Sequence, residues 1–150
     1  MSKRTQILKA LNEKFKLIDG YPPYTVDLKG NSFAKLKFWD EVNDFPSIYM
    51  HPGTETRDYH PSHFAWGMLN VCVKIYCKSE DTAQEQLETL LQDVETCIDL
   101  NRRIVYDEIN GYETTEILID SITTDEGLLA PYAVGEINLQ VRYQIMYQPM

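Results

Sequence analysis

The chain has 150 residues and a formal net charge of −9, with 43% hydrophobic and 25% charged residues. This profile predicts one globular domain spanning 1–150 that buries its own core, and it excludes a disordered chain. No apolar run is long enough to cross a bilayer, and the basic N-terminus leads into an amphipathic segment, so we expect a protein made in the cytoplasm. The acidic balance argues against a sequence-independent grip on nucleic acid, which needs clustered Lys and Arg.

The first part of the chain is predicted to contain one helix and one short strand. Apolar residues recur at helical spacing over residues 5–18, and an Asp-Gly pair followed by two prolines ends that amphipathic helix. Residues 25–44 fit either a short hairpin or a partly ordered excursion. A short strand is expected over 47–51, ended by a Pro-Gly pair, and the polar residues after it predict a projecting loop over 54–62.

The clearest strand is predicted over residues 64–77, where the odd positions are apolar or small and the even positions are mixed and aromatic. A second helix is expected over 81–100, with Asp81 and Gln84 forming a capping box at its start. One side of this helix carries an apolar stripe, and the other side, which includes Asp93, is expected to face water.

Three strands are expected in the last third of the chain. The first covers 104–108, and Asn110-Gly111 after it marks a hairpin turn. The others cover 115–124 and 134–147, and the last alternates regularly between apolar and polar residues. This order of elements predicts an α+β fold: a mixed, mainly antiparallel β-sheet with two helices packed on one side.

The sequence contains no recognisable catalytic or cofactor motif. Its three cysteines form neither a CxxC pair nor a disulfide framework and are interpreted as buried free thiols. The three histidines lack the fixed spacing of a zinc signature, and neither a GxSxG elbow nor a GxxxxGK[ST] phosphate loop is present. We therefore expect no metal, no cofactor and no enzymatic activity.

Two expected loops carry residues suited to contacts with a partner. The loop over 126–132 contains Leu128, Leu129 and Tyr132, and its apolar side chains either meet a partner or fold back onto the domain's own core. The loop over 54–62 carries both charge signs, which either set the register between neighbouring copies or face solvent.

Two segments together resemble a known family. Residues 120–145 (DSITTDEGLLAPYAVGEINLQVRYQI) combine a strand, a Gly-containing acidic turn, an apolar loop with one proline and a long alternating strand. Together with residues 45–59 (FPSIYMHPGTETRDY), they resemble the tail terminator, or tail completion, proteins of long-tailed bacteriophages of the siphophage type. The resemblance extends over most of the chain, from the first helix to the last strand.

The resemblance implies a virion structural protein of the tail and neck region. It would form a hexameric ring that caps the tail tube, stops tube polymerisation and docks a head-completion or connector protein. Its partners would be further copies of itself, the tail tube protein and that connector, with no membrane. DNA would pass through the ring without sequence-specific binding, past a wall that we expect to be acidic. The residues expected at protein interfaces are Glu55, Arg57, Tyr59, Leu128, Leu129 and Tyr132.

Two other functional classes stay open on the sequence. One is a neighbouring phage part, either a head–tail connector or a tail-tube subunit of related design. The other is a small cytoplasmic enzyme or ligand-binding module, which would need a pocket that brings polar groups such as His60 and Glu55 together.

Overall fold

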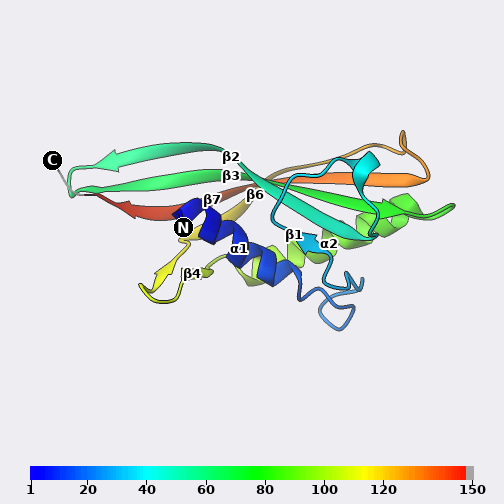
Figure 1. Ribbon diagram of the computed structural model, residues 1–150, viewed down its shortest axis with the longest axis horizontal. Coiled ribbons are helices and arrows are strands. Elements are labelled where there is room, and N and C mark those ends of the chain that lie inside the picture. Colours follow the sequence, from blue (N-terminus) through cyan, green and yellow to red (C-terminus); the bar gives the residue numbers. More distant parts are fainter. Residues whose placement is uncertain (148–150) are drawn as a thin grey trace.

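A computed structural model describes residues 1–147 of the chain, so the expected domain of 1–150 extends past the described part (Figure 1). The predicted α+β class is confirmed: two helices accompany a mixed, mainly antiparallel sheet. In chain order the elements are α1 (Lys3–Phe15), β1 (Ser32–Phe33), the 3-10 helix η1 (Trp39–Glu41), β2 (Ser47–His60), β3 (Phe64–Lys78), α2 (Ala83–Leu100), β4 (Val105–Asp107), β5 (Tyr112–Glu113), β6 (Glu116–Thr124) and β7 (Tyr132–Met146).

The main sheet has the strand order β1-β2-β3-β7-β6. β1 runs parallel to β2, and all other neighbours are antiparallel. β3 and β7 pair along their whole length, from Phe64 opposite Met146 to Lys78 opposite Tyr132. The alternation predicted for these two strands is confirmed, because the odd residues of both are buried except the half-buried Ile145, and the even residues are mostly half-buried or exposed. β4 and β5 form a separate two-stranded sheet.

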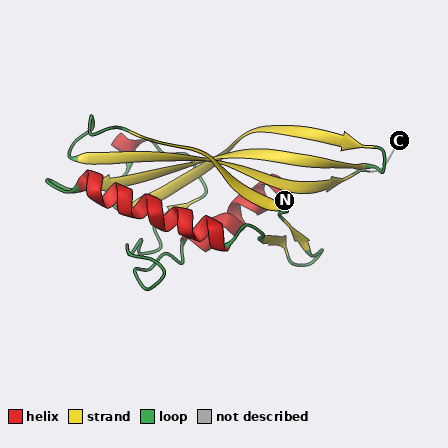
Figure 2. Ribbon diagram, turned by 180° about the vertical axis from the view of Figure 1, so that it is seen from behind, coloured by secondary structure: helices red, strands yellow, loops and turns green. Residues whose placement is uncertain are grey.

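Both helices cover the same face of the main sheet, as Figure 2 shows. The side chain of Ser2 caps α1 by accepting a hydrogen bond from the Thr5 N–H at 3.1 Å. The core between helices and sheet is apolar, and burying each of its large side chains stabilises the fold by about 1.5–3 kcal/mol. Its central members are Leu11, Phe15, Leu69, Val71, Val73, Leu87, Leu90, Val94, Ile137, Leu139 and Val141.

The start of α2 differs from the predicted capping box. The helix begins at Ala83, and its N-cap residue Thr82 makes no side-chain capping hydrogen bond. Gln84 instead donates its amide to Asp125 at 3.0 Å, so the expected pairing of Asp81 with Gln84 is wrong. Gln84 reaches Asp125 because Asp125 lies at the turn between β6 and β7, next to this end of the helix.

Asp93, which was expected to face water, is 3% exposed. Its carboxylate accepts hydrogen bonds from the backbone N–H groups of Thr25 at 3.0 Å and Val26 at 2.7 Å. A buried carboxylate needs such donors, because an unpaired charge inside a protein is costly. Asp93 therefore fastens the segment that follows α1 to the middle of α2.

β2 is much longer than predicted. It continues to His60 through the region expected to be a loop over 54–62, because residues after the Pro-Gly pair hydrogen-bond to β3. The register shifts between Pro52 and Glu55, so the expected strand end is a β-bulge. As a result β2, β3 and β7 extend beyond the helices as a three-stranded wing, residues 55–69 and 141–147 (Figures 1 and 2).

The second face of the main sheet is covered at one end only. There, the segment that precedes β2 folds over Tyr49 and Tyr76, and Phe33 stacks on Tyr49 with ring centroids 4.9 Å apart. Beyond this end, the even-numbered residues 64–74 of β3 and 136–146 of β7 form what we call the uncovered face. Cys72 is half-buried on this face, whereas the other two cysteines are buried as expected.

Candidate assembly interfaces

Glu55, Arg57 and Tyr59 lie on the wing and not on a projecting loop. They pair with Leu69, Gly67 and Ala65 of β3, whose side chains belong to the helix-covered face, so the three residues share that face. The bulge causes this arrangement: before it the even residues of β2 face the helices, and after it the odd residues do.

The structure joins these residues to Tyr143 of β7. The Tyr143 hydroxyl donates to the Glu55 carboxylate, and Arg57 Nε donates to the same carboxylate at 2.9 Å. Arg57 also donates to the Tyr59 hydroxyl at 3.4 Å. Gly67 makes room for the Tyr143 ring, because a Cβ at this position would lie 2.8 Å from it. A chain of polar contacts therefore crosses the wing.

Glu55, Arg57 and Tyr59 differ in how deeply they are buried. The Glu55 side chain is 6% exposed and the Arg57 side chain 44%, while Tyr59 is 60% exposed. Burial, together with the hydrogen bond to Glu55, raises the pKa of Tyr143, so its hydroxyl stays protonated and able to donate. Glu55 thus holds the wing together from inside, and of the three predicted interface residues only Arg57 and Tyr59 reach the surface.

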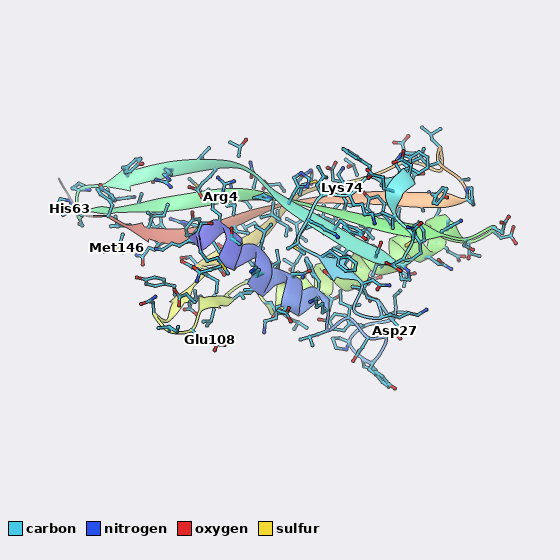
Figure 3. The ribbon with its side chains drawn as sticks, viewed as in Figure 1. Arg4, Asp27, His63, Lys74, Glu108 and Met146 are labelled. Atoms are coloured by element: carbon cyan, nitrogen blue, oxygen red, sulfur yellow. The ribbon has the colours of Figure 1, made fainter. Side chains whose placement is uncertain are left out.

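The wing ends in an aromatic tip, and Tyr59 is the one of its residues that was predicted to lie at an interface. His60 stacks on Phe64 with ring centroids 4.8 Å apart, and Tyr59 meets Tyr147 edge-on at 5.7 Å. Figure 3 labels His63 at this extreme end of the molecule, in the turn that joins β2 to β3. The signal in the sequence was the density of aromatic and histidine residues between 59 and 66.

The loop between β6 and β7 is organised by Asp125. Its carboxylate accepts from the backbone N–H groups of Leu129 at 3.1 Å and Val134 at 3.0 Å, besides the amide of Gln84. Partial burial opposes ionisation, but these hydrogen bonds outweigh it and lower the pKa of Asp125. The loop therefore has a defined shape that fixes the direction of Leu128.

Leu128, Leu129 and Tyr132 differ in how they meet solvent. Leu128 is 85% exposed, whereas Leu129 and Tyr132 are half-buried. The Tyr132 ring packs within its own chain, 5.3 Å from Trp39 and 5.8 Å from Phe45 between centroids. This loop was expected either to meet a partner or to fold back onto its own domain. Tyr132 folds back, whereas Leu128 points away from the domain.

The loop between β6 and β7, which carries Leu128, lies at the same end of the sheet as the segment that carries η1 (Figure 1). That segment also exposes large apolar side chains, which we group with Leu128 as the apolar end: Leu36 (49% exposed), Phe38 (56%) and Trp39 (37%). The wing tip lies at the opposite end of the molecule. The structure therefore separates the six predicted interface residues into two sets at opposite ends.

The main sheet has a free edge on each side, along most of β2 and along β6. β1 covers only the start of β2, at Ile48 and Tyr49, so β2 has no strand on its outer side from Met50 to His60 among the residues described. At the other side β6 is the last strand of the five. Each edge strand contains one register shift, between Pro52 and Glu55 in β2 and between Ile119 and Ser121 in β6.

The features that an enzyme would need are not brought together in the described part of the chain. His60 pairs with Asp58 at 3.3 Å on the uncovered face, while Glu55 points to the helix-covered face, so these two groups do not share a pocket. Within residues 1–147 no three His, Cys, Asp or Glu side chains are grouped to hold a metal ion. Neither described helix is long and apolar enough to span a membrane.

Comparison with known proteins gives consistent results. Residues 1–149 match a family described as Bacteriophage Tail Tube Terminator Protein. The chain is 40% identical over 153 residues to Tail tube terminator protein p142 of Escherichia phage T5, which covers 96% of this chain and 95% of that protein. Among solved structures, a chain from the virion of a native gene transfer agent particle matches with a TM-score of 0.65, covering 97% of this chain and 100% of the other. That pair is 8% identical, so the likeness shows a shared fold alone.

Proposed function

This chain belongs to the bacteriophage tail tube terminator family and so is a structural protein of the virion tail, and from that premise we propose that six copies close into a ring that caps the tail tube. The ring would end tube polymerisation and offer its other side to a head-completion or connector protein, with DNA passing through the middle. The proposal requires no bond-making chemistry, only repeated contacts between copies that close around an axis.

The observation that carries the proposal is the pair of free sheet edges. In the order β1-β2-β3-β7-β6, β2 and β7 run one way, and β3 and β6 run the other way. When copies are related by rotation about a ring axis, β6 of one copy meets β2 of the next with opposite direction. The two edges therefore fit an antiparallel ladder, which is the stronger of the two kinds of strand pairing.

This contact is heterologous, because one edge of each copy meets the other edge of its neighbour. Such a contact closes into a ring only if the rotation between copies divides a full turn. Pairing between copies would not start in the free protein, because the bulges after Pro52 in β2 and after Ile119 in β6 make both edges irregular, and irregular edges resist pairing. Pairing would then await a template, and the end of the tail tube can serve as that template.

A cap must also have two unlike sides. The aromatic wing tip and the apolar end lie at opposite ends of the strands and differ in chemistry, since histidine and tyrosine dominate the first, and Leu128 with Phe38 and Trp39 dominates the second. We propose that one end contacts the last ring of the tube and the other end contacts the connector. Interfaces commonly centre on exposed aromatic and large apolar side chains of this kind.

Electron microscopy of tails tests this function. Tails assembled without the protein are mixed with tagged protein, and the label is located by negative stain. We expect label at one tail end only, with further tube growth blocked at that end. Label along the tube would show a tube subunit instead, and the absence of label from tails would show a component of the head side.

A further inference from the structure

The two helices of the fold carry opposite charges. The charged residues of α2 are all acidic, while those of α1 and its C-cap Lys16 are all basic except Glu13. Asp93 is buried and bound by backbone N–H groups, but the other acids of α2 are half-buried or exposed. Within residues 1–147 no ion pair joins the two helices. These charges are therefore free for contacts outside the chain.

Two lysines of α1 lie on the side of the helix that faces the β2 edge of the sheet. Asn12 accepts a hydrogen bond from Ser32 of β1 at 2.6 Å, and β1 lies beside β2 at this edge. Lys9 and Lys16 stand three positions before and four positions after Asn12, so they share its side of the helix, and both are exposed. Lys16 is 3.2 Å from Glu13, an exposed contact that water weakens. We call Lys9 and Lys16 the basic row.

One side of α2 lies along β6, the other edge of the sheet. At the start of the helix, Gln84 donates its amide to Asp125, which follows the end of β6. Near the end of the helix, Asp99 is 3.4 Å from Arg102, and Arg102 is also 3.5 Å from Glu116, the first residue of β6. The two contacts hold this side of α2 against both ends of the edge strand.

Two acids lie between these contacts on the same side of α2. Glu88 stands four positions after Gln84, and Glu95 stands four positions before Asp99, so helical spacing places both along the β6 edge. Glu88 is exposed and Glu95 is half-buried. Neither forms an ion pair with another of the described residues. We call Glu88 and Glu95 the acidic row.

The two rows lie at opposite edges of the sheet and at a similar position along its strands. Figure 1 shows α1 on the near side of the molecule, and Figure 2, seen from behind, shows α2 on the near side. Ser32, which contacts Asn12, begins a line of paired residues that crosses the sheet to Gly135 of β7. A Cβ at Gly135 would lie 3.0 Å from Leu87 of α2, and Glu88 is the next residue. The basic row and the acidic row therefore flank the same part of the sheet.

Resting on the proposed edge-to-edge ring, we infer that the acidic row of α2 docks against the basic row of α1 in the next copy. When β6 of one copy pairs with β2 of the next, the sheet continues across the contact with the same face toward the helices of both copies. The β6 side of α2 then faces the β2 side of the neighbouring α1. Opposite charges on the two sides attract each other and fix the register of the contact.

The same charges make the contact directional. Two β2 edges can also pair with each other as antiparallel strands, and so can two β6 edges, which would give two-fold dimers and no ring. A β2 dimer would place α1 against α1, and a β6 dimer would place α2 against α2, so like charges would repel in both. One exposed ion pair contributes little by itself, but a ring repeats it at every contact. Charge therefore favours the one contact that continues around the ring.

Charge reversal on each row tests the inference. The α1 variant combines Lys9→Glu with Lys16→Glu, and the α2 variant combines Glu88→Lys with Glu95→Lys. The control combines Glu108→Lys with Glu113→Lys, which makes the same change in net charge as the α2 variant at two exposed acids outside both rows. Figure 3 labels Glu108 on the ribbon that carries β4 and β5. Circular dichroism establishes that each variant folds, and negative stain then scores rings and capped tails over a range of protein concentrations.

We expect each row variant alone to need about tenfold more protein or more to cap half of the tails at low salt, because every contact then joins like charges. An equal mixture of the two variants should cap as the wild type does. In a ring of six alternating copies, the two reversed rows meet each other and the two native rows meet each other, so every contact is again complementary. The defect of the single variants should fade as salt rises, and the control should cap normally.

Either row variant capping at the wild-type concentration would overturn the inference, as would a mixture that is no better than its components. Lys9→Glu and Glu88→Lys, each at an exposed position, replace the double variants if those do not fold. A wild-type protein that forms no rings on tails would contradict the proposed function itself. Wild-type rings that persist unchanged after charge reversal would contradict only the docking of α2 on α1.

Discussion

Tyr143 on β7 donates a hydrogen bond to Glu55 on β2, although β3 lies between these two strands. The contact is possible because Gly67, on β3, has no side chain to separate them. It links residues 88 positions apart in the sequence. The wing is thereby fixed as one unit, which a docking surface requires, since a rigid surface loses less entropy on binding.

We predict that Tyr143→Phe lowers the free energy of unfolding by about 1–3 kcal/mol, because it leaves the buried Glu55 carboxylate short of a donor. Urea unfolding followed by circular dichroism measures the change. Tyr59→Phe serves as the control, since Tyr59 is exposed and its contact with Arg57 is long at 3.4 Å. A loss no larger in Tyr143→Phe than in this control would show that the hydrogen bond does not hold the wing.

The proposed edge pairing predicts a disulfide between neighbouring copies. Asp58 and Leu118 both lie on the same side of the sheet as the uncovered face, because they pair with Trp66 and Gln140. Cross-strand neighbours on one face come close enough for a disulfide. In a Cys72→Ser background, Leu118→Cys is combined in turn with cysteine at Thr56, Asp58 or His60, and one combination is expected to give an oxidation ladder ending at the closed ring.

Tyr59→Cys with Leu118→Cys is the control for that ladder. Tyr59 neighbours Asp58 in the same strand but points to the opposite face, so it should not cross-link with Leu118 in a continuous sheet. Cross-links that form equally well from both faces would indicate random collision. Rings that are visible by microscopy but cross-link in none of the combinations would show that the copies meet through another surface.

The sequence predicted those strands and helices whose patterns are complete within one segment. β3 and β7 alternate over their full length, and both helices carry an apolar stripe, so their bounds were close to those observed. β2 was cut short because the Pro-Gly pair is a strong local turn signal. The hydrogen bonds from Glu55 to His60 with β3 override that signal, and they depend on residues that the local pattern does not include.

Long-range contacts of single acidic residues were also not predicted, in the core and in the candidate site. An acid on an amphipathic helix is ordinarily solvated, so nothing in the sequence around Asp93 indicated its two backbone donors at Thr25 and Val26. Glu55 was likewise predicted to be an exposed interface charge, but its carboxylate is buried and accepts a hydrogen bond from Tyr143. Leu128 was assigned because it is one of several apolar residues in an expected surface loop, and it is 85% exposed.

We predict that Leu128→Asp leaves stability within about 0.5 kcal/mol of the wild type, since the side chain is exposed. The same change is expected to abolish capping of tails, because an acid cannot be buried against a partner without a matching charge. Ile109→Asp is the control, because Ile109 is 97% exposed and lies between β4 and β5, away from the apolar end. Tails capped normally by Leu128→Asp protein would remove Leu128 from the interface.

The loop that carries Leu128 should depend on pH through Asp125. The pKa of Asp125 is held below its ordinary value of 3.8, so folding favours the ionised form. This contribution is complete above the ordinary value and is lost as the pH falls through it toward the lower folded value. Asp125→Asn, which keeps the shape but removes the charge, is expected to cost about 1–2 kcal/mol at pH 7, after allowance for partial exposure.

The difference in unfolding free energy between the wild type and Asp125→Asn should therefore shrink between pH 5 and pH 3, at roughly the values where an ordinary carboxyl protonates. Urea titrations at each pH measure it, with Glu88→Gln, an exposed acid on α2, as the control. Capping by the Asp125→Asn protein should weaken in parallel, because Leu129 and Val134 lose the acceptor that shapes the loop. A stability difference that stays constant down to pH 3 would mean that the charge of Asp125 does not organise this loop.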